Sequence, residues 1–363
     1  MIAMTPVLSR GYTFWDRALF PRDEFEERTR FVQRNLKSDQ LAGVIIWSQG
    51  YHTNGDLAFL SGNPTGGALL VTEEGEPSLF VSGGGREQYF LRMQTWIEDM
   101  HSTGGGLGKS IAESLKSRNV QGGTLGIVGF DLMSAAAKAE LAASLSGFSL
   151  IDYEPRYQQS RTAKRPREVL AVKASLDIAR EAVSAGEEVF ANGGTNAQAL
   201  VESERIARRL GARDFRALAN LEGTQLRPFE RITRSPIAPL ILWVAVDHYG
   251  YWAEAVNRSA CRSAASRAVN AMIACARPGT EAGAVARAGL AELPTSAQSG
   301  ALSYGLGSGC GLSLEETPSI EPGSKAKLVE GALLTLRACV MEKADAAFCT
   351  AMVQVRAAET IRL

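Results

Sequence analysis

The segment Gly305–Ile320, Gly-Leu-Gly-Ser-Gly-Cys-Gly-Leu-Ser-Leu-Glu-Glu-Thr-Pro-Ser-Ile, determines how the rest of the chain is interpreted. Its first half alternates glycine with small or apolar residues, and glycine lets a backbone approach a ligand or a neighbouring strand closely. A Walker loop is excluded because no Gly-Lys-Ser/Thr follows, and the glycine spacing also differs from the dinucleotide-binding fingerprint. Glycine-rich segments are often tight turns, so a purely structural role is the alternative.

The same segment resembles the Gly-His-Gly-Ile-Gly…His-Glu-x-Pro motif of the creatinase, Xaa-Pro aminopeptidase and methionine aminopeptidase family. These are the pita-bread enzymes, of the M24 metallopeptidase type. Ser308 and Glu315 stand where that family has its two histidines. The resemblance therefore implies a divergent member that keeps the scaffold and has changed the chemistry.

The bulk composition is that of an ordinary globular protein with room for two domains: 363 residues, 45% hydrophobic and 21% charged. Basic and acidic residues balance at 39 each, so no basic field for nucleic acid or for a membrane surface is expected. No apolar run reaches the roughly 18 residues that span a bilayer. Arg10, Asp16 and Arg17 argue against a signal peptide, and we expect a cytoplasmic protein.

Cysteine and histidine usage limits the possible chemistry. The cysteines are Cys261, Cys275, Cys310, Cys339 and Cys349, an odd number without a C-x-x-C pair. Reduced thiols are the expectation for this pattern. Cys310 is a candidate nucleophile, with a small buried residue as the alternative. The three histidines, His52, His101 and His248, are few for a histidine-based metal site or triad.

Strand and helix patterns alternate at the start of the chain and predict a three-layer α/β domain over residues 1–155. Strands are expected at 42–48, 58–62, 67–72, 78–82 and 123–129. The stretches 58–63 and 95–99 resemble the N-terminal domain of creatinases and prolidases. That domain supports dimerisation in the family, so the resemblance implies a homodimer in which His52, Asn54 and Arg86 could reach the partner's site.

A second domain is expected over residues 156–363. Arg161-Thr-Ala-Lys164 with Glu168 resembles the Arg-x-x-Lys-x-x-x-Glu element that opens the catalytic domain of family members. Pro166 suits the first turn of the long helix that follows. The implied fold class is an α/β N-terminal domain plus an α+β pita-bread C-terminal domain.

The family's two-metal site uses two Asp, one His and two Glu, because hard divalent ions favour charged oxygens. Residue by residue, the resemblance places these ligands on Trp243, Glu254, Ser308, Arg337 and Thr350 or Ala351. One carboxylate remains, and an arginine repels a cation. The sequence therefore predicts no metal and no other cofactor.

The candidate catalytic residues are Glu254, Glu315 and His248. Glu254, buried near tryptophans, would have a raised pKa and could act as a general acid or base, or could pair with Arg337 or Arg258. Glu315 and Glu316 would point to opposite faces of a strand, so at most one enters the pocket. His248 lies at a strand-to-turn corner, where a solvated side chain is the alternative.

The candidate substrate-binding residues are Arg337, Ser308, Trp252, Arg231 and Trp243. Arg337 would offer a fixed fork to a carboxylate or an oxyanion, with an internal ion pair as the alternative. Arg231 lies in a charged loop that borders the pocket in this fold. The tryptophans suit an apolar pocket, and they suit equally a core that fills the former metal volume.

Two functions remain open from the sequence. The first is a metal-independent, creatinase-like hydrolase or lyase acting on a C–N (amide or amidine-type) or related bond of a small polar molecule. The creatinase histidine itself is replaced by Phe229, which argues against creatinase activity. The alternative is a non-catalytic pseudoenzyme that binds a ligand or a protein partner. A conventional peptidase ranks third, because it needs the metals.

Overall fold

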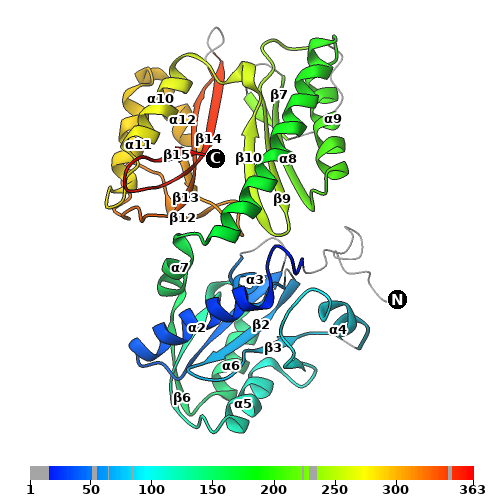
Figure 1. Cartoon of the computed structure of the whole chain (residues 1–363), viewed down its shortest axis with the longest axis vertical. Helices are drawn as coiled ribbons and strands as arrows, with labels where there is room; N and C mark the ends of the chain where they lie inside the picture. The colour runs from blue at the N-terminus through cyan, green and yellow to red at the C-terminus, as the bar shows by residue number, and fades with distance from the viewer. Residues whose placement is uncertain are drawn as a thin grey trace. The chain divides into compact units, whose positions relative to one another are not determined.

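The chain is described here by a computed structural model, whose described residues are 16–50, 55–63, 65–83, 85–222, 225–228, 235–341 and 346–363. It divides into a first unit, Met1–Arg161, and a second unit, Thr162–Leu363. Figure 1 shows the elements of both units. The division lies a few residues after the boundary expected at residue 155.

In the described part of the first unit, six strands form one sheet in the order β4-β3-β2-β1-β5-β6. These are β1 (Gly43–Gly50), β2 (Thr65–Thr72), β3 (Ser78–Val81), β4 (Met100–Ser102), β5 (Gly123–Val128) and β6 (Phe148–Asp152). Strand β1 is antiparallel to β2 and parallel to β5. Its residues Val44, Ile45 and Ile46 are fully buried, as expected for a strand covered on both faces.

Helices accompany this sheet, which confirms the α/β class of the first unit. They are α2 (Arg22–Ser38), α3 (Asp56–Ser61), α4 (Gly85–Leu91), α5 (Leu107–Ser117), α6 (Ala135–Ser144) and α7 (Glu154–Thr162), with the 3-10 turn η1 (Phe130–Leu132).

One expected strand, 58–62, is wrong: α3 occupies this stretch. Leu57 and Leu60 are buried at helical spacing. Gly62 ends the helix in the left-handed conformation (φ 70°), and its N–H donates to the Ala58 carbonyl. A C-cap of this kind favours glycine, whereas a short apolar run alone does not separate a strand from a helix.

The described part of the second unit contains two sheets. One has the order β10-β9-β7-β8 and the other β12-β11-β13-β14-β15. The strands are β7 (Asp214–Glu222), β8 (Gln225–Arg227), β9 (Leu242–His248), β10 (Tyr251–Val256), β11 (Gly307–Gly309), β12 (Glu316–Ser319), β13 (Leu333–Val340), β14 (Ala347–Gln354) and β15 (Ile361–Arg362). The helices are α8 (Pro166–Ala191), α9 (Asn196–Arg209), α10 (Ser263–Cys275), α11 (Ala282–Ala291) and α12 (Thr295–Tyr304), with the 3-10 turn η2 (Arg258–Ala260).

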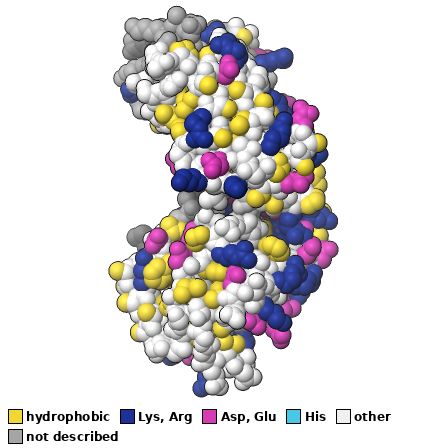
Figure 2. All heavy atoms as spheres, turned by 90° about the vertical axis from the view of Figure 1, so that its left-hand side faces the viewer, with side chains coloured by type: hydrophobic (Ala, Val, Ile, Leu, Met, Phe, Trp, Pro, Cys, Tyr) yellow, Lys and Arg dark blue, Asp and Glu magenta, His cyan; other side chains and the backbone are white. Residues whose placement is uncertain are grey.

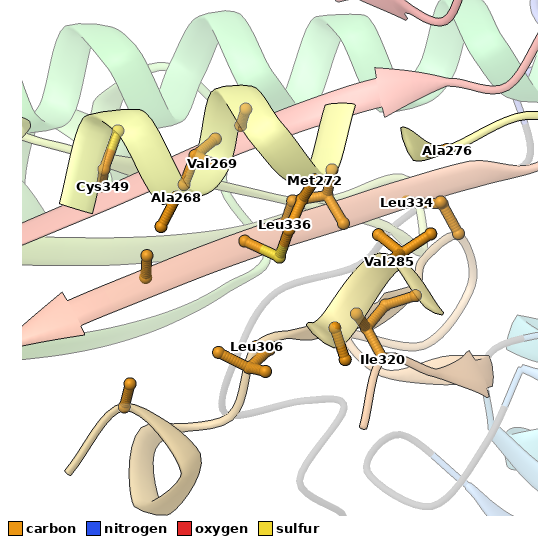
Figure 3. Close-up of a cluster of buried hydrophobic side chains, with 14 of the residues drawn as sticks. Ala268, Val269, Met272, Ala276, Val285, Leu306, Ile320, Leu334, Leu336 and Cys349 are labelled. Atoms are coloured by element: carbon orange, nitrogen blue, oxygen red, sulfur yellow. The ribbon is translucent and has the colours of Figure 1, made fainter. Parts of the chain in front are cut away.

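Each of these sheets buries one face under helices. Val244, Val246 and Ala255 pack with α8 and α9. Leu334 and Leu336 pack with α10 and α11, and Figure 3 shows Ala268, Val269 and Met272 of α10 directed towards Leu336. Because side chains alternate along a strand, the residues between these positions lie on the opposite faces.

The two opposite faces meet and are termed the inner faces here. A hydrophobic cluster joins them, with Trp243 and Trp252 from one sheet and Cys339 and Phe348 from the other. The backbone N–H of Glu254 in β10 also donates to Met352 Sδ in β14 at 3.2 Å. The inner faces therefore form one layer between the two sheets.

Basic and acidic side chains lie close to one another on the surface drawn in Figure 2. This agrees with the equal numbers of basic and acidic residues in the chain. Among the described helices, none combines the length and the apolar character needed to cross a bilayer.

The expectation of five reduced thiols is wrong for one pair. Cys261 and Cys349 are joined by a disulfide that links the residue after η2 to β14. Cys275, Cys310 and Cys339 are free, and the last two are buried. Burial raises the pKa of the Cys310 thiol to about 12 despite the nearby Lys164 ammonium, and burial also raises the pKa of Cys339.

These environments predict an order of thiol reactivity. With pKa values raised well above pH 8, Cys310 and Cys339 stay protonated, so iodoacetamide at pH 8 should modify Cys275 first in the folded protein. Peptide mapping should find three alkylated cysteines after unfolding without reduction, and five after reduction. Rapid alkylation of Cys310 in the folded protein would contradict this description.

Candidate functional site

A buried ion pair connects the inner faces of the second unit. Glu254 of β10 and Arg337 of β13 are 1% and 6% exposed. Arg337 Nε donates to Glu254 Oε1 and Oε2 at 2.8 and 2.9 Å, and Arg337 Nη2 donates to Oε2 at 2.6 Å. Thr350, which faces Arg337 across β13 and β14, donates its hydroxyl to Oε1 at 2.7 Å. Both carboxylate oxygens are therefore engaged as acceptors.

Electrostatics hold this arrangement in place. Burial alone would lower the pKa of Arg337, but the charge and hydrogen bonds of Glu254, together with Glu315, raise it well above its usual value. The guanidinium therefore stays charged inside the protein. A buried charge of this kind is tolerated only when an opposite charge and hydrogen bonds compensate it.

Glu315 and Glu316 take different partners. Glu315 Oε1 accepts from Arg337 Nη1 at 3.0 Å, although the Glu315 side chain is 67% exposed. Glu316 begins β12, and its Oε2 accepts from the buried Lys164 Nζ at 2.5 Å. The neighbouring carboxylates thus approach two different basic groups, and only Glu315 joins Glu254 and Arg337.

Three polar side chains on the inner faces are buried with unmet hydrogen-bonding capacity. Among the described residues of the second unit, Trp243 (Nε1) and Ser308 (Oγ) have no hydrogen-bond partner, and Thr335 (Oγ1) lies beside the Cys310 thiol. Ser308 and Thr335 face each other across β11 and β13. The ring of Trp243 has its centroid 5.9 Å from Arg337 Cζ. The predicted binding residues Trp243, Ser308 and Arg337 are therefore brought together.

Of two other predicted residues in the second unit, one lies on the inner face and one does not. Trp252 is buried on the inner face, where Arg216 Cζ lies 4.8 Å from the centroid of its ring. His248 is three residues from Ala245, the residue that faces Glu254, so its side chain lies on the other face of β9. There its Nδ1 lies 3.0 Å from the Gly211 carbonyl. The structure therefore separates His248 from Glu254 and Glu315.

The remaining predicted residues fall outside what the structure describes. Arg231, His52, Asn54 and Phe229 lie in undescribed segments. Arg86 belongs to α4, but its side chain is not among those described.

Two contributors to the site were not among the candidate catalytic or binding residues. The resemblance placed a former ligand position on Thr350 or Ala351, and hairpin register favours Thr350, because Arg337 lies five residues before and Thr350 five residues after the run 342–345. Lys164 holds Glu316 on the side of the site next to Cys310 and carries no sequence signal for this partner.

Several carboxylates of this region are bound to basic side chains. Besides the Glu254 and Glu316 pairs, the buried Asp247 accepts from Arg213 Nε at 2.9 Å and from Arg213 Nη2. Burial raises the pKa of Asp247, and Arg213 opposes that effect. Within the described ranges, no three His, Cys, Asp or Glu side chains are grouped as a metal ion would require.

Comparison with known proteins identifies the architecture. No protein-family model and no curated protein matches the sequence. The chain superposes on the X-Pro aminopeptidase of Thermotoga maritima with a TM-score of 0.74 at 13% identity, covering 92% of this chain and 96% of that one. The chain has the pita-bread fold.

Two further structures share this fold. The dipeptidase PepE of Mycobacterium ulcerans gives a TM-score of 0.68 at 20% identity, with 96% of each chain covered. The N-terminal domain of the FACT complex subunit SPT16 from chickpea, Cicer arietinum, gives 0.65 at 12% identity, with 93% of this chain and 95% of that chain covered. The predicted fold class is confirmed, and at these identities the likeness concerns the fold.

Substitutions in the buried Glu254–Arg337 ion pair should change the free energy of unfolding in a defined order. Glu254→Gln should lower the free energy of unfolding by about 3–5 kcal/mol, because it leaves a buried guanidinium without its counter-charge. The double variant Glu254→Met/Arg337→Met should lose less than the single variant, because neither charge remains buried alone. Urea unfolding measures both changes.

The matched control for this series is Glu202→Gln. Glu202 pairs with Arg205 on the surface at 2.6 Å, so its loss should leave the urea midpoint unchanged. A Glu254→Gln protein as stable as the Glu202→Gln protein would show that the buried pair does not hold the inner faces together.

Proposed function

We propose that this chain is a non-catalytic binding protein with a pita-bread fold. The observation that carries the proposal is the bidentate pairing of Glu254 with Arg337. A general acid or base must reach the atoms of its substrate, whereas both oxygens of Glu254 are engaged by Arg337 and Thr350. Glu315 bonds to the same arginine, and His248 lies on the other strand face. Both candidate glutamates are therefore held by the same guanidinium, and the candidate histidine is separated from them.

The residues present also do not fit a divalent metal pair. Such sites need several carboxylate oxygens that are free to bind cations. At the positions carried over from the family, this chain offers one carboxylate, Glu254, and a guanidinium bonds to both of its oxygens. The proposed function therefore includes no step that involves a metal.

The comparisons are compatible with a binding function. Two of the structures named above are an aminopeptidase and a dipeptidase, whereas the third is a domain of a subunit of the FACT complex. The same fold thus occurs in a protein named for its membership of a complex. A second copy of this chain, expected from the resemblance, is the proposed protein partner.

A second candidate is a metal-independent enzyme acting on a C–N or related bond of a small polar molecule. The observation that favours it is the pair of unpartnered polar atoms on Trp243 and Ser308 among the described residues, because such groups could orient a substrate. In this alternative Arg337 anchors the substrate, and the exposed Glu315 transfers the proton.

The two candidates and the peptidase differ in measurable ways. For the purified full chain, elemental analysis after dialysis against MnCl₂ should find less than one metal ion per chain. Xaa-Pro dipeptides should not be cleaved with Mn²⁺ or Co²⁺ present, because the donor set does not fit the metals. Native mass spectrometry of the same sample reports the oligomeric state and any retained organic ligand.

Two results would contradict the proposed non-catalytic binding function. Metal-dependent Xaa-Pro cleavage would contradict the proposal and support the peptidase. Metal-independent turnover of an amide or amidine that is lost in Glu315→Gln would favour the second candidate. The Glu202→Gln variant serves as the matched control, because Glu202 pairs with Arg205 in α9, away from the inner faces.

A further inference from the structure

Buried polar atoms without partners are rare in folded proteins, and each one requires an explanation. In the described part of the second unit, two such side-chain atoms, Trp243 Nε1 and Ser308 Oγ, lie on the inner faces, and a third, Thr335 Oγ1, lies there beside the Cys310 thiol. Each of these residues is less than a tenth exposed. Their grouping on one pair of facing surfaces indicates a place for a ligand with polar groups of its own.

The three residues lie on the same inner faces as Arg337. Thr335 precedes Arg337 by two residues on β13, so both side chains lie on the same face, and Ser308 faces Thr335 from β11. Trp243 approaches Arg337 from the other sheet, with its ring centroid 5.9 Å from Cζ. A ligand held by Arg337 would therefore have two hydroxyl groups and an indole N–H close to it.

The contact of Arg337 with Glu315 lies next to the protein surface. Glu315 bonds to Nη1 at 3.0 Å while 67% of its side chain is exposed, so its carboxylate enters from the surface. Gly305 leaves space beside that nitrogen, because a Cβ built on it would meet Arg337 Nη1 alone, at 4.0 Å. A carboxylate from solution can approach Nη1 by the path that Glu315 takes.

The two glutamates bound to Arg337 are not equivalent. Glu254 is buried and accepts three hydrogen bonds from Arg337, so its removal would leave a charge uncompensated in the interior. Glu315 makes a single, largely exposed contact, and contacts of that kind contribute little to stability. Glu315 is therefore the exchangeable partner, and a ligand that replaces it with one negative charge keeps the local charge balance.

We propose that the inner faces bind a small organic monocarboxylate that carries a hydroxyl or oxo group and displaces Glu315 from Arg337. The ligand carboxylate accepts from Arg337 Nη1, as guanidinium groups favour. Its hydroxyl or oxo oxygen bonds to the group formed by Ser308, Thr335 and Trp243. This inference rests on the proposed binding function and specifies its ligand.

The test is titration calorimetry of the full chain with sodium lactate and sodium pyruvate at constant ionic strength, with lactamide as the neutral control. Saturable binding of at least one carboxylate and no binding of lactamide are expected. Glu315→Gln should bind roughly twofold to fivefold more tightly, because the internal competitor loses its charge. Ser308→Ala should bind roughly fivefold to tenfold more weakly, because it loses one ligand hydrogen bond.

The same variants separate a ligand site from a structural role. Since the Ser308 hydroxyl has no partner among the described residues, Ser308→Ala should not lower the thermal midpoint of the free protein while it weakens binding. Binding of lactamide equal to that of lactate, or unchanged affinity in the folded Ser308→Ala protein, would overturn the site.

Failure of the inference and failure of the proposed function give different results. If neither carboxylate binds the folded wild-type or Glu315→Gln protein, the carboxylate site is refuted and the non-catalytic function is untouched. If mass spectrometry finds that a bound probe has been converted to product, the carboxylate site is supported and the non-catalytic function is refuted.

Discussion

A charge removed from water must find an opposite charge and hydrogen bonds within the protein, and in this chain Arg337 and Glu254 meet that requirement for each other. One residue comes from each sheet of the second unit, so their pairing joins the inner faces. Thr350 supplies the remaining hydrogen bond to the carboxylate. Because Glu254 is held in this pair, its role is structural. Glu315 is then the carboxylate that a ligand from solvent can replace on Arg337.

This division of roles relates the fold to the function. Pita-bread proteins present two sheets with facing inner surfaces, and the side chains there decide whether the space holds metals, a ligand or only other side chains. In this chain the acidic groups of the region are bound to Arg337, Arg213 and Lys164. The positive charges at the site are therefore the protein's own arginine and lysine side chains. The unpartnered hydroxyl and indole groups are left to form hydrogen bonds with a ligand.

Much of the fold could be predicted from the sequence, because buried strands and the long helix α8 have strong periodic patterns and Pro166 starts that helix as expected. The glycine-rich segment and Glu254 could also be assigned through the family resemblance. The helix α3 was missed, because its run of four apolar residues suits either a strand or a helix. The left-handed backbone at Gly62, which ends the helix, is not visible in that run.

The partners within the site were harder to predict. The sequence left Arg337 open between a substrate anchor and an internal ion pair, and three-dimensional proximity resolves its pairing with Glu254. The same holds for the disulfide between Cys261 and Cys349, which are 88 residues apart in the sequence. His248 was considered together with Glu254, but strand alternation places the two side chains on opposite faces.

The anomalous difference map of a crystal grown with MnCl₂ tests the Glu254–Arg337 pairing most directly. We expect the Arg337 guanidinium to lie on the Glu254 carboxylate, with no manganese peak between the inner faces. A manganese peak coordinated by Glu254, with Arg337 turned away, would contradict it and would return the chain to the metal-dependent enzymes.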